Sequence, residues 1–480
     1  IHRRGDQQVH ARDGAGRVSG VSLRGNAASI LVATLSSAFG VCLLQVNNVL
    51  GTVLHQNEQT GGSTTVALFL TIVAIVFIAI AIYVSAVVTA NTFSTIIAGR
   101  TRTIALLRLI GASARSQRAA VAREGLVVGL IGSALGALIG TGVAAAITVI
   151  GVATALIPAA HYWFLPPVIA LPIVAVVITT WAASWVGSRR VLVVSPMQAT
   201  GAAQERSSTE AAGKPVRNRA ALALVIIGGA FLALGVAVGL VSPAGVLIGV
   251  VGGILSFTGL VFGSQRIMPP ALRLAGRLLG RSSPARLAGE NALRYPERSS
   301  RMTIGLVIGV TLITMFSVAM GSFQESIHSA LTDRPDPGLD QVLLVTVAIF
   351  SVLIGFSALI AAVGMVNNLS LSVLQRTREL GLLRALGFTT RQVRTMILAE
   401  SAQLTIAATL VGLAFGFVYG WAGAQSLLGA LNGAHFVVPS IPWAIIAVIV
   451  VAAAVLTLAA SVIPSRRATL VAPVAALAVE

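Results

Sequence analysis

Arg376-Thr-Arg-Glu-Leu-Gly-Leu-Leu-Arg-Ala-Leu-Gly387 lies between two long apolar runs, so we expect a short, water-exposed segment at a membrane surface. The spacing of its leucines predicts one or two turns of amphipathic helix. Leu380 and Leu383 fall on one side of that helix, and Leu382 and Leu386 form an adjacent stripe. The charged residues that keep the remaining surface in water are Arg376, Arg378, Glu379 and Arg384.

Local signals predict where this helix ends and the next one begins. Gly387 is placed to end it as a left-handed cap, because glycine has no Cβ to clash there. Thr389-Thr-Arg-Gln392 has the residue types and spacing of a capping box, which opens a helix. We therefore expect a short helix, a break, and a membrane span that begins near Arg394.

The same pattern occurs earlier in the chain, in Arg100-Thr-Arg-Thr-Ile-Ala-Leu-Leu-Arg-Leu-Ile-Gly111, at an offset of 276 residues. Ten of 25 positions are identical between 100–124 and 376–400. They are Arg100, Thr101, Arg102, Leu106, Leu107, Arg108, Gly111, Arg115, Arg118 and Glu124. A single copy would also fit an ordinary arginine-rich loop, but a register kept into the next span indicates an internal duplication. We call 100–111 and 376–387 the coupling segments.

The second copy resembles the FtsX/MacB-type permeases of ABC transporters. The similarity rests on the motif at 376–387, on Glu400 and the glycine-rich span after it, and on Pro464-Ser-Arg-Arg-Ala468 and Pro473. The first copy departs from this pattern where Thr103 replaces the acidic residue and Ala105 replaces the glycine. The duplicated copies cover roughly 90–200 and 366–477.

Composition indicates a polytopic membrane protein, since 56% of the residues are hydrophobic and only 10% are charged. The net charge of +18 does not indicate nucleic-acid binding, because the arginines lie in loops between apolar runs. The single cysteine, Cys42, excludes a disulfide within the chain and any site built from several cysteines.

Ten spans are expected, in two four-span pseudo-repeats and a central two-span hairpin, with no large extracytoplasmic domain. They lie near 28–52, 64–90, 120–152, 166–187, 220–241, 245–264, 303–323, 343–372, 397–428 and 441–463. With these bounds every basic residue except Arg334 faces one side. The positive-inside rule makes that side cytoplasmic and places both termini there. The implied location is the bacterial cytoplasmic membrane.

Three regions follow from this all-α arrangement. Residues 1–199 form the first repeat, 200–264 a linker with the central hairpin, and 265–480 the second repeat. The second repeat is expected to begin with interfacial helices, because Arg273, Arg277 and Arg281 repeat every four residues opposite a leucine face. Ser283-Pro284 opens a further helix that stops before Pro296.

Catalytic motifs are largely missing from the sequence. The only lysine, Lys214, precedes a proline, so the chain has no phosphate-binding loop of its own. The six histidines are scattered without metal-ligand spacing, so we expect no metal site. No acidic pair lies inside a span, which argues against a secondary transporter driven by ions.

Two further sets of residues have structural interpretations. Glu124 and Glu400, at the inner mouths of the third and ninth spans, more plausibly pair with nearby arginines than take part in catalysis. Two runs of glycine at every fourth position predict close helix packing, at an interface between halves or subunits. These glycines are Gly132, Gly136, Gly140, Gly412, Gly416 and Gly420.

The resemblance implies a membrane subunit without enzymatic activity, coupled to a separate ABC ATPase that binds ATP and Mg²⁺ and acts as a dimer. It also implies a lipophilic or amphipathic substrate such as a lipid, peptide or antibiotic, and contact with membrane lipids. The alternative is a non-transporting regulator that passes ATPase motion to an external hydrolase or a sensor kinase. The residues assigned to ATPase coupling are Arg100, Arg102, Leu106, Leu107, Arg108, Gly111, Arg376, Arg378, Glu379, Leu380, Leu383, Arg384 and Gly387.

Overall fold

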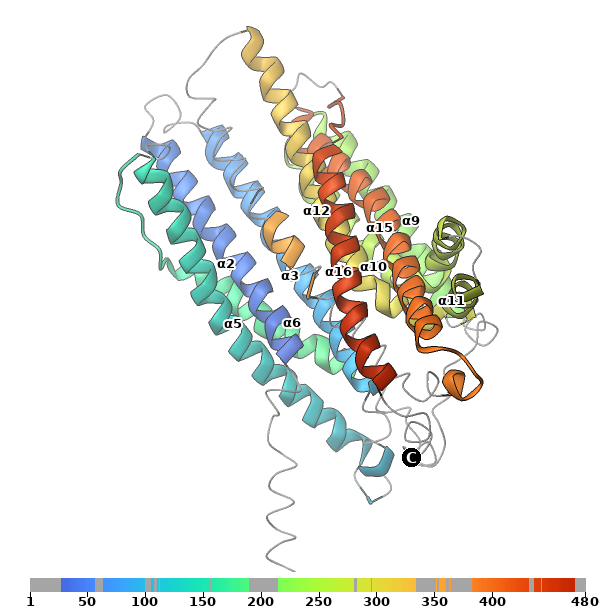
Figure 1. Ribbon diagram of the computed structural model, residues 1–480. Coiled ribbons are helices and arrows are strands. Elements are labelled where there is room, and N and C mark those ends of the chain that lie inside the picture. Colours follow the sequence, from blue (N-terminus) through green and yellow to red (C-terminus); the bar gives the residue numbers. More distant parts are fainter. Residues whose placement is uncertain are drawn as a thin grey trace, which may run out of the picture.

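All regular elements in the part of the chain that the structure describes are helices, as expected from the sequence. The computed structural model describes residues 27–56, 64–99, 105–107, 110–111, 113–154, 158–189, 215–279, 283–294, 296–333, 351, 354–359, 362–363, 382–430, 436–441 and 443–470. The elements, drawn in Figure 1, are α2 (Ala27–Gln56), α3 (Thr64–Gly99), α5 (Ala114–Ala153), the 3₁₀ turn η1 (Pro167–Ile169), α6 (Ala170–Gly187), α9 (Pro215–Gly239), α10 (Gly245–Leu278), α11 (Ser283–Arg294), α12 (Pro296–Asp333), α15 (Thr390–Leu428) and α16 (Trp443–Leu470).

Eight of the described helices are long and apolar enough to cross a membrane: α2, α3, α5, α6 with η1, α9, α10, α12 and α15. Helices suit this sequence because backbone groups in a bilayer must find their hydrogen-bond partners within the chain. The expected span 343–372 lies mostly outside the described residues. In α16 the apolar part, Trp443–Val455, is shorter than the other eight. The chain is therefore a multi-pass membrane protein, and the count of ten spans is not confirmed.

The helices form two halves that meet along α3 (Figure 1). In the first half α2 packs on α3 and α5, and α6 packs on both α3 and α5. In the second half α15 lies against α12, α16 and the hairpin of α9 and α10. Because α3 also contacts α10 and α12, one apolar core runs through both halves, from Phe39 and Cys42 on α2 to Phe316 on α12.

The spaced glycines of both copies make close contacts inside each half. A Cβ added at Gly136 would lie 2.5 Å from the Cβ of Ser37 on α2, and one at Gly416 would lie 2.5 Å from the Cβ of Thr314 on α12. The other glycines that approach these two helices are Gly132, Gly140, Gly412 and Gly420. The expected location between halves or subunits is therefore wrong. Each run brings α5 or α15 against the first helix of its own half, since small residues let two backbones approach closely.

The helix after the central hairpin differs from the prediction. Residues 265–278 continue α10 through Pro269 and Pro270 and do not start a separate interfacial helix. Each proline removes one backbone donor, but the turns on both sides preserve the helix. Leu272 on this extension is fully buried, whereas Leu274 and Leu278 are exposed. The next prediction is confirmed, because α11 runs from Ser283 to Arg294 and α12 then begins at Pro296.

Candidate functional site

Both coupling segments end in a glycine with a left-handed backbone. The φ angle is 101° at Gly111 and 96° at Gly387, a region that residues with a Cβ rarely adopt. These two glycines lie just before α5 and α15, whose first residues are toward the lower ends of those helices in Figure 1. The sequence prediction of a left-handed stop at Gly387 is confirmed.

The turn at Gly387 is a complete Schellman motif. The amide of Phe388 donates to the carbonyl of Leu383 at 3.1 Å, and the amide of Gly387 donates to the carbonyl of Arg384 at 3.1 Å. The apolar contact that often accompanies this motif is also present, since Leu383 and Phe388 pack against one buried cluster. The short helix is thus held rigidly at its end.

The predicted capping box opens α15 directly after this turn. The Thr389 hydroxyl accepts from the amide of Gln392 at 3.2 Å, and the Gln392 side chain accepts from the amide of Thr389 at 2.9 Å. In the first copy Ser113 caps α5 by accepting from the amide of Ser116 at 3.1 Å. The Ser116 hydroxyl in turn donates to the Ser113 carbonyl at 2.9 Å, so the reciprocal bond here goes to a carbonyl and not, as at Gln392, to an amide.

Exposure divides the leucines of the coupling segments into two sets. Leu382 and Leu386 of the second copy point away from the protein, and Leu386 is 71% exposed. Leu106 and Ile110 hold the same positions in the first copy, and Ile110 is 81% exposed. Leu383, which the sequence suggested as a docking residue, instead packs on its own chain. The more exposed stripe is therefore formed by Leu382 and Leu386 in the second copy and by Leu106 and Ile110 in the first, and the assignment of these segments to coupling stays a prediction.

Several residues assigned to coupling lie outside the described part of the chain. They are Arg100, Arg102, Arg108, Arg376, Arg378, Glu379 and Leu380. Of the remaining assigned residues, Leu107 and Arg384 are half-buried.

Helix α11 covers the beginning of α15 and forms a joint with it. Val393, Met396 and Ile397 of α15 and Ala288 of α11 are buried together, with Leu383 and Phe388 packed on them. We call these six residues the α11–α15 joint. Their burial means that the coupling segment, α11 and α15 cannot shift independently without opening a packed apolar contact.

A buried amide extends this joint to α10. The Nε2 atom of Gln403 on α15 donates to the carbonyl of Leu272 on α10 at 2.8 Å. Gly276 of α10 and Gly289 of α11 both lie close to this amide, and a Cβ added at Gly276 would lie 2.9 Å from its Nε2 atom, so the Gln403 side chain would have to shift. The sequence analysis did not single out Gln403, although an amide three residues after Glu400 in an apolar helix was a usable signal.

The two acidic residues occupy equivalent places near the beginnings of α5 and α15. Glu400 is buried, and Glu124 is half-buried. Their pairing with arginines, expected from the sequence, stays a prediction. No group of three or more His, Cys, Asp or Glu residues in the described part of the chain is placed to hold a metal ion.

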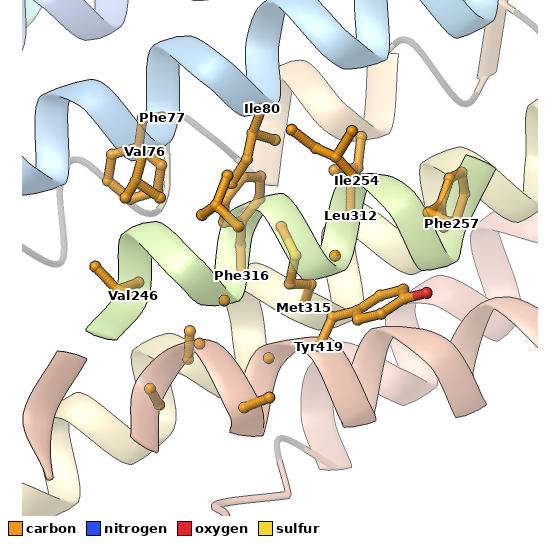
Figure 2. Close-up of a pocket in the computed structure, with 18 of the residues that line it drawn as sticks. Val76, Phe77, Ile80, Val246, Ile254, Phe257, Leu312, Met315, Phe316 and Tyr419 are labelled. Atoms are coloured by element: carbon orange, nitrogen blue, oxygen red, sulfur yellow. The ribbon is translucent and has the colours of Figure 1, made fainter. Parts of the chain in front are cut away.

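A cavity of about 200 Å³ lies where the two halves meet (Figure 2). Its walls come from α3 of the first half, from α12 and α15 of the second half, and from α10 of the central hairpin, with Leu232 of α9. Phe77 of α3 and Phe316 of α12 are in contact in its lining, with ring centroids 5.8 Å apart. Sequence reasoning missed this cavity because its lining is as apolar as a surface that faces lipid.

Three aromatic rings pack together in the lining of the cavity. Phe257 of α10 stands between Tyr83 of α3 and Tyr419 of α15, with centroids 6.3 Å and 6.2 Å away. The Tyr83 hydroxyl hydrogen-bonds to Thr258 at 2.9 Å and the Tyr419 hydroxyl to Ser256 at 3.0 Å. Both tyrosines are therefore tied to α10 on either side of Phe257.

The chain is thus a duplicated multi-pass helical membrane protein with a matched turn at one end of each half. Residues 75–195 and 351–472 match the FtsX-like permease C-terminal family, and together they make up just over half of the chain. The chain belongs to this family, which confirms the resemblance noted in the sequence.

Two relatives come from Bacillus subtilis (strain 168). The Uncharacterized ABC transporter permease YknZ is 31% identical over 144 residues, which is 30% of this chain and 34% of that protein. The ABC transporter permease YtrF is 25% identical over 121 residues, 24% of this chain and 28% of that protein. The match thus spans about a third or less of each relative.

Proposed function

We propose that this chain is the membrane subunit of an ABC transporter, coupling ATP hydrolysis in a separate subunit to export or to force transmission across the membrane. Family membership supports the class, as do two relatives that are described as ABC transporter permeases. ATP and Mg²⁺ would bind to the partner subunit, in keeping with the missing phosphate-binding loop of this chain.

The observation that carries the proposal is the pair of capped turns that present exposed apolar residues at one end of the bundle. Leu382 and Leu386 in one copy, and Leu106 and Ile110 in the other, offer two similar surfaces about which an ATPase dimer can close. Exposed apolar groups outside a membrane span commonly mark contact sites for another protein.

Rigid connection of these turns to the spans gives the coupling its mechanism. Since the Schellman turn and the capping box join the second segment to α15 without a flexible linker, a push on Leu386 tilts α15 itself. The α11–α15 joint and Gln403 pass the same displacement to α11 and α10. In the proposed orientation the coupling segments and both termini lie in the cytoplasm, as the arginine distribution favours.

Association with the ATPase tests the proposal directly. We expect Leu386→Asp and Ile110→Asp each to weaken co-purification with the ATPase subunit at least tenfold, because an aspartate placed in an apolar contact loses its water. The control is Leu278→Asp on α10, a leucine of similar exposure toward the same end of the bundle. The partner used is the ATP-binding subunit of the adjacent reading frame, co-expressed with the full chain.

Full association and full coupled ATP turnover in both variants would show that docking takes place elsewhere. An adjacent reading frame for a hydrolase or a sensor kinase would favour a regulator over a transporter.

A further inference from the structure

Each helix of the central hairpin carries an uncharged stretch that is as long as a bilayer crossing. No residue between Arg219 on α9 and Arg266 on α10 is charged. Arg219 lies 20 residues before Gly239, the last residue of α9, and Arg266 lies 21 residues after Gly245, the first residue of α10. Both stretches are about 30 Å long at the rise of an α-helix, which is the thickness of the hydrocarbon core. The two arginines therefore mark where the hairpin leaves the hydrocarbon, at the end opposite its turn.

Beyond this boundary α10 continues as a helix with an exposed basic surface. Arg273 and Arg277 follow Arg266 at intervals of seven and four residues, which puts the three side chains on one side of the helix. All three are exposed, whereas Met268 and Leu272 on another side of α10 are fully buried. The structure gives none of the three arginines a hydrogen bond or an ion pair with another described residue. We call Arg266, Arg273 and Arg277 the arginine stripe.

The stripe continues an exposed apolar surface that lies inside the hydrocarbon. Phe262 precedes Arg266 by one helical turn on the same side of α10, and its side chain is 52% exposed. The head-group layer of a bilayer is about 5–7 Å thick on each side. Arg266 and Arg273 are about 10 Å apart along the helix, so lipid phosphates lie between the levels of these two residues. The apolar and basic parts of this surface thus follow each other in the order of the parts of a phospholipid.

We propose that the arginine stripe binds the phosphate of one anionic phospholipid, with the apolar part of the same lipid beside Phe262. A guanidinium group matches a phosphate through two parallel charge-assisted hydrogen bonds. A zwitterionic lipid adds an ammonium group beside the phosphate, which the arginines repel, so a lipid with a net negative charge is favoured. An acidic soluble protein would also attract arginines, but Arg266 lies at the edge of the hydrocarbon, where a lipid phosphate is the nearest anion.

This site goes beyond the proposed function, and it adjoins the contacts that join α10 to α15. Leu272, directly before Arg273, accepts the hydrogen bond from Gln403 of α15. A lipid on the stripe therefore binds the same part of α10 that α15 holds. The hairpin lies outside the matched segments 75–195 and 351–472, so the stripe is not part of the duplicated unit.

Two other arginines provide a matched control. Arg219 is as far from the hairpin turn as Arg266, but it lies on the other side of the hairpin. A Cβ added at Gly259 of α10 would lie 2.8 Å from the carbonyl of Ala221, so Ala221 is on the side of α9 that faces α10. Two residues along a helix are about 200° apart, so Arg219 points away from α10. Arg123 on α5 is also exposed and belongs to the first half.

The experiment titrates the purified full chain in detergent with phosphatidylglycerol, without ATPase or nucleotide, and counts bound lipids by native mass spectrometry. We expect the double variant Arg266→Gln with Arg273→Gln to bind the first phosphatidylglycerol at least fivefold more weakly than the unchanged chain. The double variant Arg219→Gln with Arg123→Gln loses the same charge and should bind it like the unchanged chain. Phosphatidylcholine should bind more weakly than phosphatidylglycerol, and equally to all three proteins. Soluble glycerol phosphate should not compete.

Equal weakening in both double variants would overturn the inference, because net charge alone would then explain the binding. Equally tight binding of phosphatidylcholine would overturn it too, as would competition by glycerol phosphate, which would identify a site for free phosphate.

A second measurement uses the unchanged chain and stays decisive even if the stripe variant does not fold. Phosphatidylglycerol with a diazirine on its head group is mixed into phosphatidylcholine nanodiscs, and we expect label on α10 between Phe262 and Arg277. Label confined to other parts of the chain would contradict the proposal. Because no ATPase is present, a failure here leaves the docking result for Leu386 and Ile110 untouched.

Discussion

The two coupling segments end in the same turn but are anchored to different parts of the protein. At the second, the residues of α15 that face α11 are Val393, Met396 and Ile397, which are all buried. At the first, the equivalent positions on α5 are occupied by Gln117, Ala120 and Val121, which are exposed or only half-buried.

The first copy has its own attachment, directed to α6. The Arg118 guanidinium lies 3.9 Å from the centre of the Trp185 ring and donates to the Trp185 carbonyl at 3.3 Å. Val121 packs in a cluster with Ala33 of α2 and Val176 of α6. If the segments move as proposed, movement of the first would be passed within its own half, and movement of the second would reach α10 and α11. The two copies therefore share the turn, but the residues just after it pack on different helices: on α11 in the second copy and on α2 and α6 in the first.

The largest expected effect comes from placing a charge at equivalent positions of the two copies. Met396→Asp should destabilise the α11–α15 joint by about 3 kcal/mol or more, because it removes a buried side chain and buries a carboxylate. Ala120→Asp should change stability by less than about 0.5 kcal/mol, since Ala120 is exposed. Thermal unfolding in detergent, followed by tryptophan fluorescence, measures both.

Equal destabilisation by Met396→Asp and Ala120→Asp would show that the two attachments are not different after all.

A smaller effect is expected where the copies are alike. Gly111→Ala and Gly387→Ala should each cost about 1 kcal/mol, because both backbones have positive φ and alanine is strained there. Asparagine tolerates this conformation better, so Gly→Asn should recover part of the loss at each site. The same unfolding assay, with hydrogen exchange at Phe388 and Ser113, checks the result. A cost at only one glycine would mean that the two turns are not equivalent.

The smallest effects should separate the two routes. Gln403→Leu removes a hydrogen bond to Leu272 and should cost about 1 kcal/mol. Arg118→Leu removes a cation–π contact worth about 0.5–1 kcal/mol. We expect hydrogen exchange to rise around α10 and α11 in the first variant and around α6 in the second. Faster exchange of all three helices in both variants would indicate a single shared route.

The features that the sequence predicted correctly are those that depend only on residues close together in the chain. The stop at Gly387 and the capping box from Thr389 to Gln392 follow from local backbone chemistry, and the structure has both. It did not predict which leucines are exposed, because Leu383 is covered by α11, whose Ala288 is distant in sequence. The continuation of α10 through Pro269 and Pro270 was also missed, since proline in an apparent boundary favours a break.

The cavity escaped prediction for a different reason. In a membrane protein the bilayer is as apolar as the interior, so hydropathy does not distinguish Phe77 or Val246 from residues that face lipid. The spaced glycines predicted close packing, but the identity of the helix they approach depends on how the helices assemble.

Because α10 is a single continuous helix, it contacts both the cavity and Gln403 of α15. At one end Val246 and Phe257 border the cavity, and at the other Leu272 accepts the hydrogen bond from Gln403. Pro269 and Pro270 lie between these contacts, where missing backbone bonds make a helix easiest to bend. A force that moves α10 at Leu272 would also move its residues at the cavity, except for the part that bending at the prolines absorbs. By thermodynamic reciprocity, any ligand of the cavity that changed the free energy of ATPase docking would have its own binding free energy changed by the same amount when the ATPase docks.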